Sequence, residues 1–174
     1  MIDYNFGVSL TGVEGDDDIT ALYHLRNHPE VWKWCRQRGP LHYDHHYAYW
    51  AGVLDPDQTH TKLYLIKNKG KTIGCAGFTS IDHINARAEF SLYLDPTIRG
   101  IGLGESSLKT LFCFGFRMLN FNCIWGETFE ANPAANLFEK IGMTKEGSRR
   151  QFYFRDGKYI DAHLYSVLRS EWMF

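Results

Sequence analysis

The sequence predicts a single mixed α/β (α+β) domain with a central, mostly antiparallel twisted sheet flanked by helices. Three features predict this class. Antiparallel strands lead into a glycine-rich turn and a helix, another strand and helix follow, and a hairpin around Asp156 and Gly157 ends the chain. The 174 residues contain no repeat, linker or low-complexity segment, so the domain is expected to span residues 1–174.

The first third of the chain is expected to contain a strand and two helices. Phe6, Val8 and Leu10 alternate as in a strand. An acidic triplet beginning at Asp16 precedes helical periodicity, which is typical of a helix start, and this helix stops before Pro29. A second helical face, suited to packing on a sheet, consists of Tyr43, His46, Tyr47, Trp50 and Leu54.

Three histidines lie close together at the start of this second helix, namely His42, His45 and His46. Such a group can suggest a metal site. No matching cysteine or carboxylate set accompanies them, so we expect no metal and favour a solvated or acceptor-lining histidine group.

The middle of the chain predicts three antiparallel strands and a strand–turn–helix unit. Residues 62–66 and 72–78 form a hairpin around an Asn/Gly turn, and a third strand returns through residues 86–94. Residues 105–119 have the apolar spacing of a helix, and residues 124–128 are typical of a strand.

A glycine-rich turn joins the third strand to the helix. Its glycines allow backbone N–H groups to approach an anion, with the positive end of the helix dipole behind them. No Gly-Lys-Ser/Thr follows, and the spacing is not G-x-G-x-x-G, which excludes two common phosphate loops. A tight connection without a ligand is the alternative. The pattern Arg99-x-x-Gly102-x-Gly104 resembles the pyrophosphate loop of the GCN5-related N-acetyltransferases (GNAT).

Two later segments strengthen this resemblance. Residues 132–143 are similar to the family's "N...lyeklGF" segment, and residues 146–172 are similar to the branch that holds ribosomal-protein N-terminal and amino-sugar N-acetyltransferases. The resemblance extends from about Leu63 to Trp172. It implies a GNAT-like fold, acetyl-CoA as cofactor, and acetyl transfer to a primary amine of a protein N-terminus or amino sugar by direct attack on the thioester. Residues 27–32 resemble the stretch that forms one wall of the family's acceptor site, although an ordinary helix–helix turn is equally compatible.

The resemblance also implies a set of cofactor-binding residues. The strand before the turn pairs with the pantetheine arm, the loop amides hold the pyrophosphate, and the later segment supplies a side-chain amide from Asn132 or Asn136. The full set is Leu92, Tyr93, Leu94, Arg99, Gly100, Ile101, Gly102, Leu103, Gly104, Asn132, Asn136, Phe138 and Lys140.

Two carboxylates are candidate general bases, each acting through a water. Glu89 shares a strand face with Ser91 and Tyr93, and the branch often has Glu at this point; a solvated strand carboxylate is the alternative. Glu127 is the second candidate, one strand over.

The proton donor to the leaving sulfur is less well defined. Phe138 stands where many family members carry a proton-donating tyrosine. Tyr93, Tyr159 or Tyr165 could substitute, or no acid is needed because a thiol of pKa ~8.5 leaves readily as thiolate.

Physical chemistry also bears on the acceptor. At pH 7 an amine of pKa ~10.4 is neutral in well under ~1% of molecules, whereas an α-amine of pKa ~7.7–8.0 is neutral in about a tenth. Because the sequence offers few candidate catalytic acids and bases, an α-amine or amino-sugar amine is favoured over a lysine amine as the acceptor. A non-catalytic acyl-CoA-binding module and an unrelated α/β interaction domain are the alternatives.

Composition sets the remaining expectations. The chain is 44% hydrophobic, enough for one core, and its net charge of −1 gives no bias towards nucleic acid. Its four cysteines lack a C-x-x-C motif, which favours buried thiols in a reducing compartment. Without an apolar run of ~18 residues or a leader pattern, the protein is expected to be soluble and cytoplasmic, with no membrane partner. A small-molecule or peptide amine is the expected partner, and a homodimer is left open.

Overall fold

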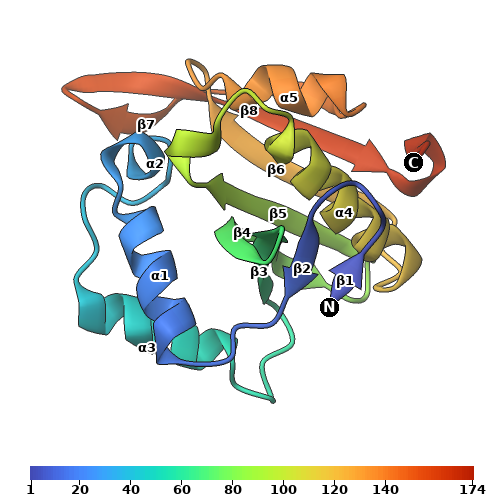
Figure 1. Cartoon of the computed structure of the whole chain (residues 1–174). Helices are drawn as coiled ribbons and strands as arrows, with labels where there is room; N and C mark the ends of the chain where they lie inside the picture. The colour runs from blue at the N-terminus through green and yellow to red at the C-terminus, as the bar shows by residue number, and fades with distance from the viewer.

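The computed structural model describes all 174 residues and contains one eight-stranded sheet in the order β1-β2-β3-β4-β5-β6-β8-β7 (Figure 1). The strands are β1 (Ile2–Asp3), β2 (Ser9–Thr11), β3 (Lys62–Asn68), β4 (Lys71–Asp82), β5 (Arg87–Leu94), β6 (Cys123–Phe129), β7 (Thr144–Arg155) and β8 (Lys158–Leu168). The α-helices are α1 (Asp16–Arg26), α2 (Pro29–Trp32), α3 (Tyr43–Val53), α4 (Leu103–Arg117) and α5 (Ala134–Lys140). Neighbouring strands are antiparallel except β5 and β6, which are parallel. The predicted fold class is confirmed.

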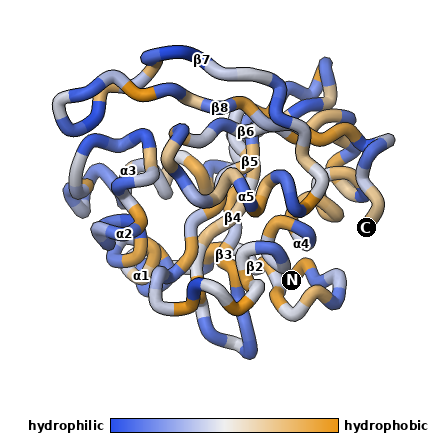
Figure 2. Tube along the Cα trace, turned by 90° about the horizontal axis from the view of Figure 1, so that it is seen from above, coloured by the Kyte–Doolittle hydropathy of each residue, from blue (hydrophilic) through white to orange (hydrophobic).

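Helices lie on both sides of the sheet. Figures 1 and 2 show α1, α2 and α3 grouped on one side and α4 and α5 on the other, with the central strands between them. The larger hydrophobic core packs α4 and α5 on the sheet, and it includes Phe78, Phe90, Phe112 and Ile124. A smaller core of Val13, Ile19, Leu22, Trp50, Leu65 and Cys75 joins α1 and α3 to the opposite face.

The first predicted strand is shorter than expected. Residues 6–10 were expected to be extended, but Asn5 and Gly7 adopt positive φ angles of 63° and 86°. The chain therefore turns there, and β1 pairs back on β2 with Ile2 opposite Leu10.

The predicted apolar face of α3 is only partly buried. His46 and Trp50 are buried, as predicted, whereas Tyr47 and Leu54 are exposed. Leu54 lies beyond the last helical turn, and the Tyr47 hydroxyl donates to Asp16 Oδ1 at 3.1 Å in solvent. His42 and His45 are exposed as well, and no group of three or more His, Cys, Asp or Glu side chains is arranged to hold a metal ion.

The cysteines are all free thiols. Cys75 and Cys113 are buried, while Cys35 and Cys123 are half-buried. None of the helices combines the length and apolar composition that crossing a bilayer requires.

The parallel pairing of β5 with β6 is short. It joins residues 87–89 to residues 123–125 and then stops, although β5 continues to pair with β4 as far as Leu94. The Phe90 ring lies against Gly126, where an added Cβ would collide with Phe90 Cε1. From Phe90 onward the two strands separate, and the backbone groups of β5 that point towards β6 have no strand partner.

Gly126→Ala should therefore destabilise the protein. The new methyl group meets an aromatic ring that packs on Phe112 at 5.3 Å and on Phe138 at 5.1 Å between centroids, so it cannot be accommodated by a free rotation. Overpacking of this kind costs about 1–3 kcal/mol. The free energy of unfolding, measured by urea denaturation, should therefore fall by about this amount.

Gly52→Ala in α3 is the matched control, because nothing lies within 4 Å of its added Cβ. It should leave the free energy of unfolding unchanged or raise it by up to about 1 kcal/mol. Equal stability of the Gly126 variant and the wild type would show that the Phe90 ring is not fixed against Gly126.

Candidate functional site

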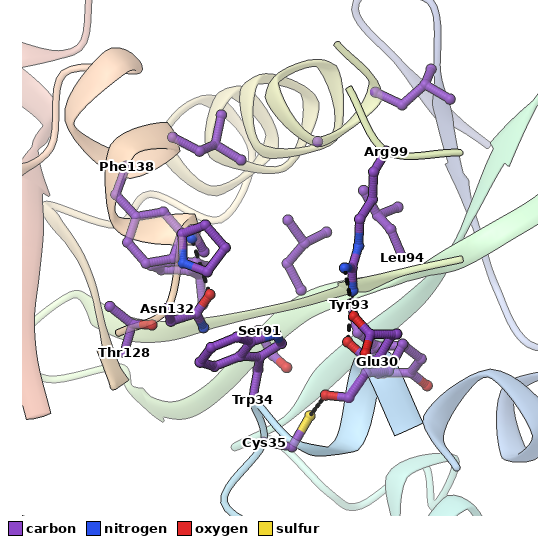
Figure 3. Close-up of a pocket in the computed structure, with 18 of the residues that line it drawn as sticks. Glu30, Trp34, Cys35, Ser91, Tyr93, Leu94, Arg99, Thr128, Asn132 and Phe138 are labelled. Atoms are coloured by element: carbon purple, nitrogen blue, oxygen red, sulfur yellow. Dashed lines mark hydrogen bonds and ion pairs between the residues drawn. The ribbon is translucent and has the colours of Figure 1, made fainter. Parts of the chain in front are cut away.

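A cavity of about 670 Å³ opens where β5 and β6 separate (Figure 3). Its walls are the ends of these strands, the segment from α2 through Arg36, the turn before α4, and the start of α5. Figure 3 shows Arg99 at one end and Thr128, Asn132 and Phe138 at the other, with Trp34 between them. Of residues 27–32, which were predicted to form one wall of the acceptor site, only Glu30 and Val31 line the cavity, and the acceptor role stays a prediction.

The glycine turn presents free backbone amides to one end of the cavity. Gly100 and Gly102 have φ angles of 82° and 84°, which favour glycine, and Gly102 is the residue that caps α4. The first hydrogen bond of α4 runs from the Ser106 amide to the Gly102 carbonyl at 3.1 Å. The amides of residues 103–105 therefore lack intrahelical partners, and a helix start of this kind can accept an anion.

Asp95 fixes the entry to this turn. Its Oδ1 accepts from the Thr97 amide at 2.9 Å and from Thr97 Oγ1 at 2.7 Å, and its own amide donates to the Ile73 carbonyl at 2.8 Å. The hydrogen bonds from Thr97 lower the pKa of the Asp95 carboxyl. The turn is thus anchored to β4 before it reaches the glycines.

Arg99 connects the turn to the opposite wall. Its Nη1 lies 3.1 Å from Glu30 Oε2, and its Nη2 donates to the Glu30 carbonyl oxygen at 2.6 Å (Figure 3). Hydrogen bonds from Lys33 and Arg99 lower the pKa of the Glu30 carboxyl. The side chain lies at the cavity's edge, and its predicted contact with a pyrophosphate stays a prediction.

The structure brings most of the predicted cofactor residues to this cavity. Those that line it are Leu92, Tyr93, Leu94, Arg99, Gly100, Gly102, Leu103, Gly104, Asn132, Phe138 and Lys140. Ile101 and Asn136 are exposed and do not line it. Asn132 Oδ1 accepts from the Ala134 amide at 3.0 Å, which leaves its amide nitrogen without a protein partner. Lys140 Nζ lies 2.5 Å from Glu105 Oε2 at the start of α4.

The two predicted carboxylates lie on the two separating strands and share one cation. Arg36 Nη2 contacts Glu89 Oε1, and Arg36 Nε lies 3.0 Å from Glu127 Oε1. The carboxylate side chains are only 9% and 4% exposed. Arg149 Nη1 lies 3.1 Å from Glu127 Oε2, and the Tyr153 hydroxyl donates to Glu127 Oε1. Two buried carboxylates are thus balanced by two arginines.

The pKa shifts follow from these contacts. Burial alone disfavours the Arg36 cation, but its hydrogen bond to Glu89 and the charges of Glu89 and Glu127 outweigh burial and raise its pKa. Burial and the bond to Glu127 raise the pKa of Tyr153. At neutral pH Arg36 is therefore charged and the Tyr153 hydroxyl is protonated.

Sequence reasoning missed Arg36 and Tyr153. A pair of buried carboxylates needs a cation, so a partner of that kind can be expected. The cation is Arg36, which lies 53 residues before Glu89 in the chain. The hydroxyl partner is Tyr153, which lies 26 residues after Glu127. No sequence motif connects either residue to its carboxylate.

The three tyrosines predicted as substitute acids lie in different environments. Tyr93 lines the cavity, and burial and the neighbouring Cys75 raise its pKa well above the usual value. The Tyr165 hydroxyl donates to Glu139 Oε1 at 3.3 Å outside the cavity, and Tyr159 is exposed beside the β7–β8 turn. A catalytic role for Tyr93 stays a prediction.

Known proteins share this fold and sequence pattern. Residues 10–144 match the family model of the acetyltransferase (GNAT) domain. The uncharacterized N-acetyltransferase p20 of Bacillus licheniformis is 31% identical over 109 residues, which are 62% of this chain and 61% of p20, less than two thirds of that relative. Spermidine N(1)-acetyltransferase of Escherichia coli K12 is 25% identical over 159 residues, or 90% of this chain and 84% of the enzyme.

A solved structure supports the same assignment at the level of the fold. Spermidine N-acetyltransferase from Vibrio cholerae, in complex with CoA and spermine, superposes with a TM-score of 0.88 at 21% identity and covers 96% of this chain and 98% of that one. The chain therefore belongs to the GNAT acetyltransferase family and carries an acetyl-CoA-dependent N-acetyltransferase domain.

Proposed function

We propose that the protein acetylates a weakly basic primary amine, such as the α-amine of a peptide or the amine of an amino sugar. The family assignment supports acetyl transfer to an amine in general. The preference for a weakly basic amine is inferred from the pairing of both cavity carboxylates with arginines.

The residues of the cavity fit acetyl-CoA. The free amides at the start of α4 suit a diphosphate, because several convergent N–H groups bind a charged group at about 1.5–3 kcal/mol each. The unpaired edge of β5 beyond Phe90 suits the amide groups of the pantetheine arm, and the Asn132 side chain offers a further donor. Acetyl-CoA supplies an acetyl thioester whose sulfur leaves readily.

Glu89 is positioned to act as general base through a water. Its Oε1 is held by Arg36, whereas its Oε2 has only a contact with Ser80 Oγ at 3.5 Å. That second oxygen can accept a hydrogen bond from a water, which in turn takes the proton of the acceptor amine. Arg36 fixes the orientation of the carboxylate. Glu127 has Arg36, Arg149 and Tyr153 on its two oxygens, which supports a structural role beside the base.

The charges at this end favour an acceptor that arrives partly neutral. Arg36 and Arg149 already offset Glu89 and Glu127, and Arg155 adds a cation that donates to the Gln37 carbonyl at 2.6 Å. A carboxylate bound to a guanidinium takes a proton poorly from an ammonium of pKa ~10.4. An amine of pKa ~7.7–8.0 makes a smaller demand on the carboxylate, because about a tenth of its molecules are already neutral at pH 7.

A polyamine is the second candidate, and the E. coli relative, named a spermidine N(1)-acetyltransferase, favours it. Two buried carboxylates would suit an ammonium group if Arg36 moved away from them. Acetylation of a polyamine would thus require Arg36 to break its contacts with Glu89 and Glu127.

An amine panel tests the acceptor class. With free thiol release as the signal at pH 7, dipeptides or amino sugars, including nucleotide-linked ones, should exceed spermidine in kcat/KM by more than about tenfold, in line with their larger neutral fraction. Arg36→Gln should raise kcat/KM for spermidine and so reduce the preference for dipeptides or amino sugars. Arg38→Gln is the matched control, since Arg38 is exposed in the same segment and makes no side-chain hydrogen bond. Spermidine as the best wild-type acceptor would instead establish the second candidate.

Glu89→Gln tests the base. The variant keeps the size of the side chain and an acceptor for Arg36, so its thermal unfolding and its affinity for CoA should stay close to wild type. Loss of general base catalysis should lower kcat by about 10²–10⁴-fold. Glu130→Gln, at an exposed carboxylate directly after β6, should retain full activity. If Glu89→Gln and Glu127→Gln both retain the wild-type rate, neither carboxylate is the base.

A further inference from the structure

Thr128 carries a buried hydroxyl without a partner. The residue is 6% exposed, and its Oγ1 makes no hydrogen bond. A buried polar group left unpaired destabilises the folded state, so most buried polar groups in native proteins have a hydrogen-bond partner. The buried hydroxyls of α4, by contrast, are paired: Ser107 Oγ donates to the Leu103 carbonyl at 2.7 Å, and Thr110 Oγ1 to the Ser106 carbonyl at 2.9 Å.

The position of Thr128 distinguishes it from the other unpaired groups. Six buried side chains have an unpaired polar atom, and Thr128 alone among them lines the cavity. The others are Thr11, Gln37, His46, Trp50 and Trp172. Of these six residues, only Thr128 is therefore in the wall that a molecule bound in the cavity would meet.

Thr128 lies at the end of the cavity where Phe138 supplies no hydroxyl. Figure 3 shows it with Asn132 at the same end as Phe138, opposite Arg99. The Phe138 ring is buried between Phe90 and Tyr165, with centroids 5.1 and 5.5 Å away, and has no proton to donate. Thr128 follows Glu127 directly along β6, so its backbone lies at the carboxylate end of the cavity rather than at the anion-binding end, with the two side chains on opposite faces of the strand.

We propose that the Thr128 hydroxyl donates a hydrogen bond to the sulfur of CoA and stabilises the negative charge that develops there. In the overall reaction the acceptor nitrogen forms a bond to the acetyl carbon, the carbon–sulfur bond breaks with its electron pair on sulfur, and the proton of the amine passes through water to Glu89. Thr128 keeps its own proton throughout. This inference rests on the proposed function only in using acetyl-CoA as donor, and it is independent of the acceptor.

A comparison of CoA with desulfo-CoA tests the contact, using the full chain and isothermal titration at a pH above the thiol pKa of ~8.5. Wild type should bind CoA more tightly than desulfo-CoA. Thr128→Val removes only the hydroxyl and should reduce this difference by about 10- to 100-fold, as expected for a hydrogen bond to a charged group. Its kcat should fall by a similar factor. Thr128→Ser keeps the hydroxyl and should restore both quantities.

The outcomes are separable. An unchanged ratio of the two affinities in Thr128→Val overturns the proposal, and so does an equal loss of both ligands, which would indicate a structural role. If wild type binds neither ligand, the proposed function fails as well. A second readout needs no variant: the pKa of the bound thiol, followed by thiolate absorbance in wild type, should lie below that of free CoA, and an unshifted or raised pKa would contradict the proposal.

Discussion

The cavity depends on the contact between the Phe90 ring of β5 and Gly126 of β6. A parallel ladder normally satisfies the backbone of both strands along their length, and a continued ladder would close the space between β5 and β6. Here pairing ends at Glu89 and Trp125, because the next position on one strand is a large ring and its neighbour on the other has no side chain. The same contact opens the cavity and frees one edge of β5. It also places Glu89 and Glu127 on opposite sides of the opening.

Polar contacts hold the segment from α2 through Gln37 against the sheet. Arg36 contacts both sheet carboxylates, Arg155 of β7 donates to the carbonyls of Cys35 and Gln37, and Arg99 bonds Glu30. Of these groups only the two sheet carboxylates are nearly fully buried, and exposed ion pairs contribute little stability and are screened by salt. Apart from the two sheet carboxylates, the contacts that attach this segment are therefore weak ones. The sheet and α4, by contrast, are held by tightly packed aromatic side chains.

Much of the fold was predictable because it depends on local patterns. Strand alternation, the hairpin turns and the glycine turn before α4 follow from residues close together in the chain, and the structure has each of them. The division of the first strand was missed because positive φ at Asn5 is not apparent from alternation. At the site, the glycine loop and both carboxylates were identified from the resemblance to the family and from strand faces. Arg36 and Thr128 were not, because one depends on a distant segment and the other on a missing partner that only packing reveals.

A crystal structure of the protein with CoA tests the central claim most directly. The split between β5 and β6 should hold the pantetheine arm along the free edge of β5, with the diphosphate at the amides of residues 103–105 and the sulfur beside Thr128. CoA bound at another surface, or a sheet whose β5–β6 pairing closes in the complex, would contradict it.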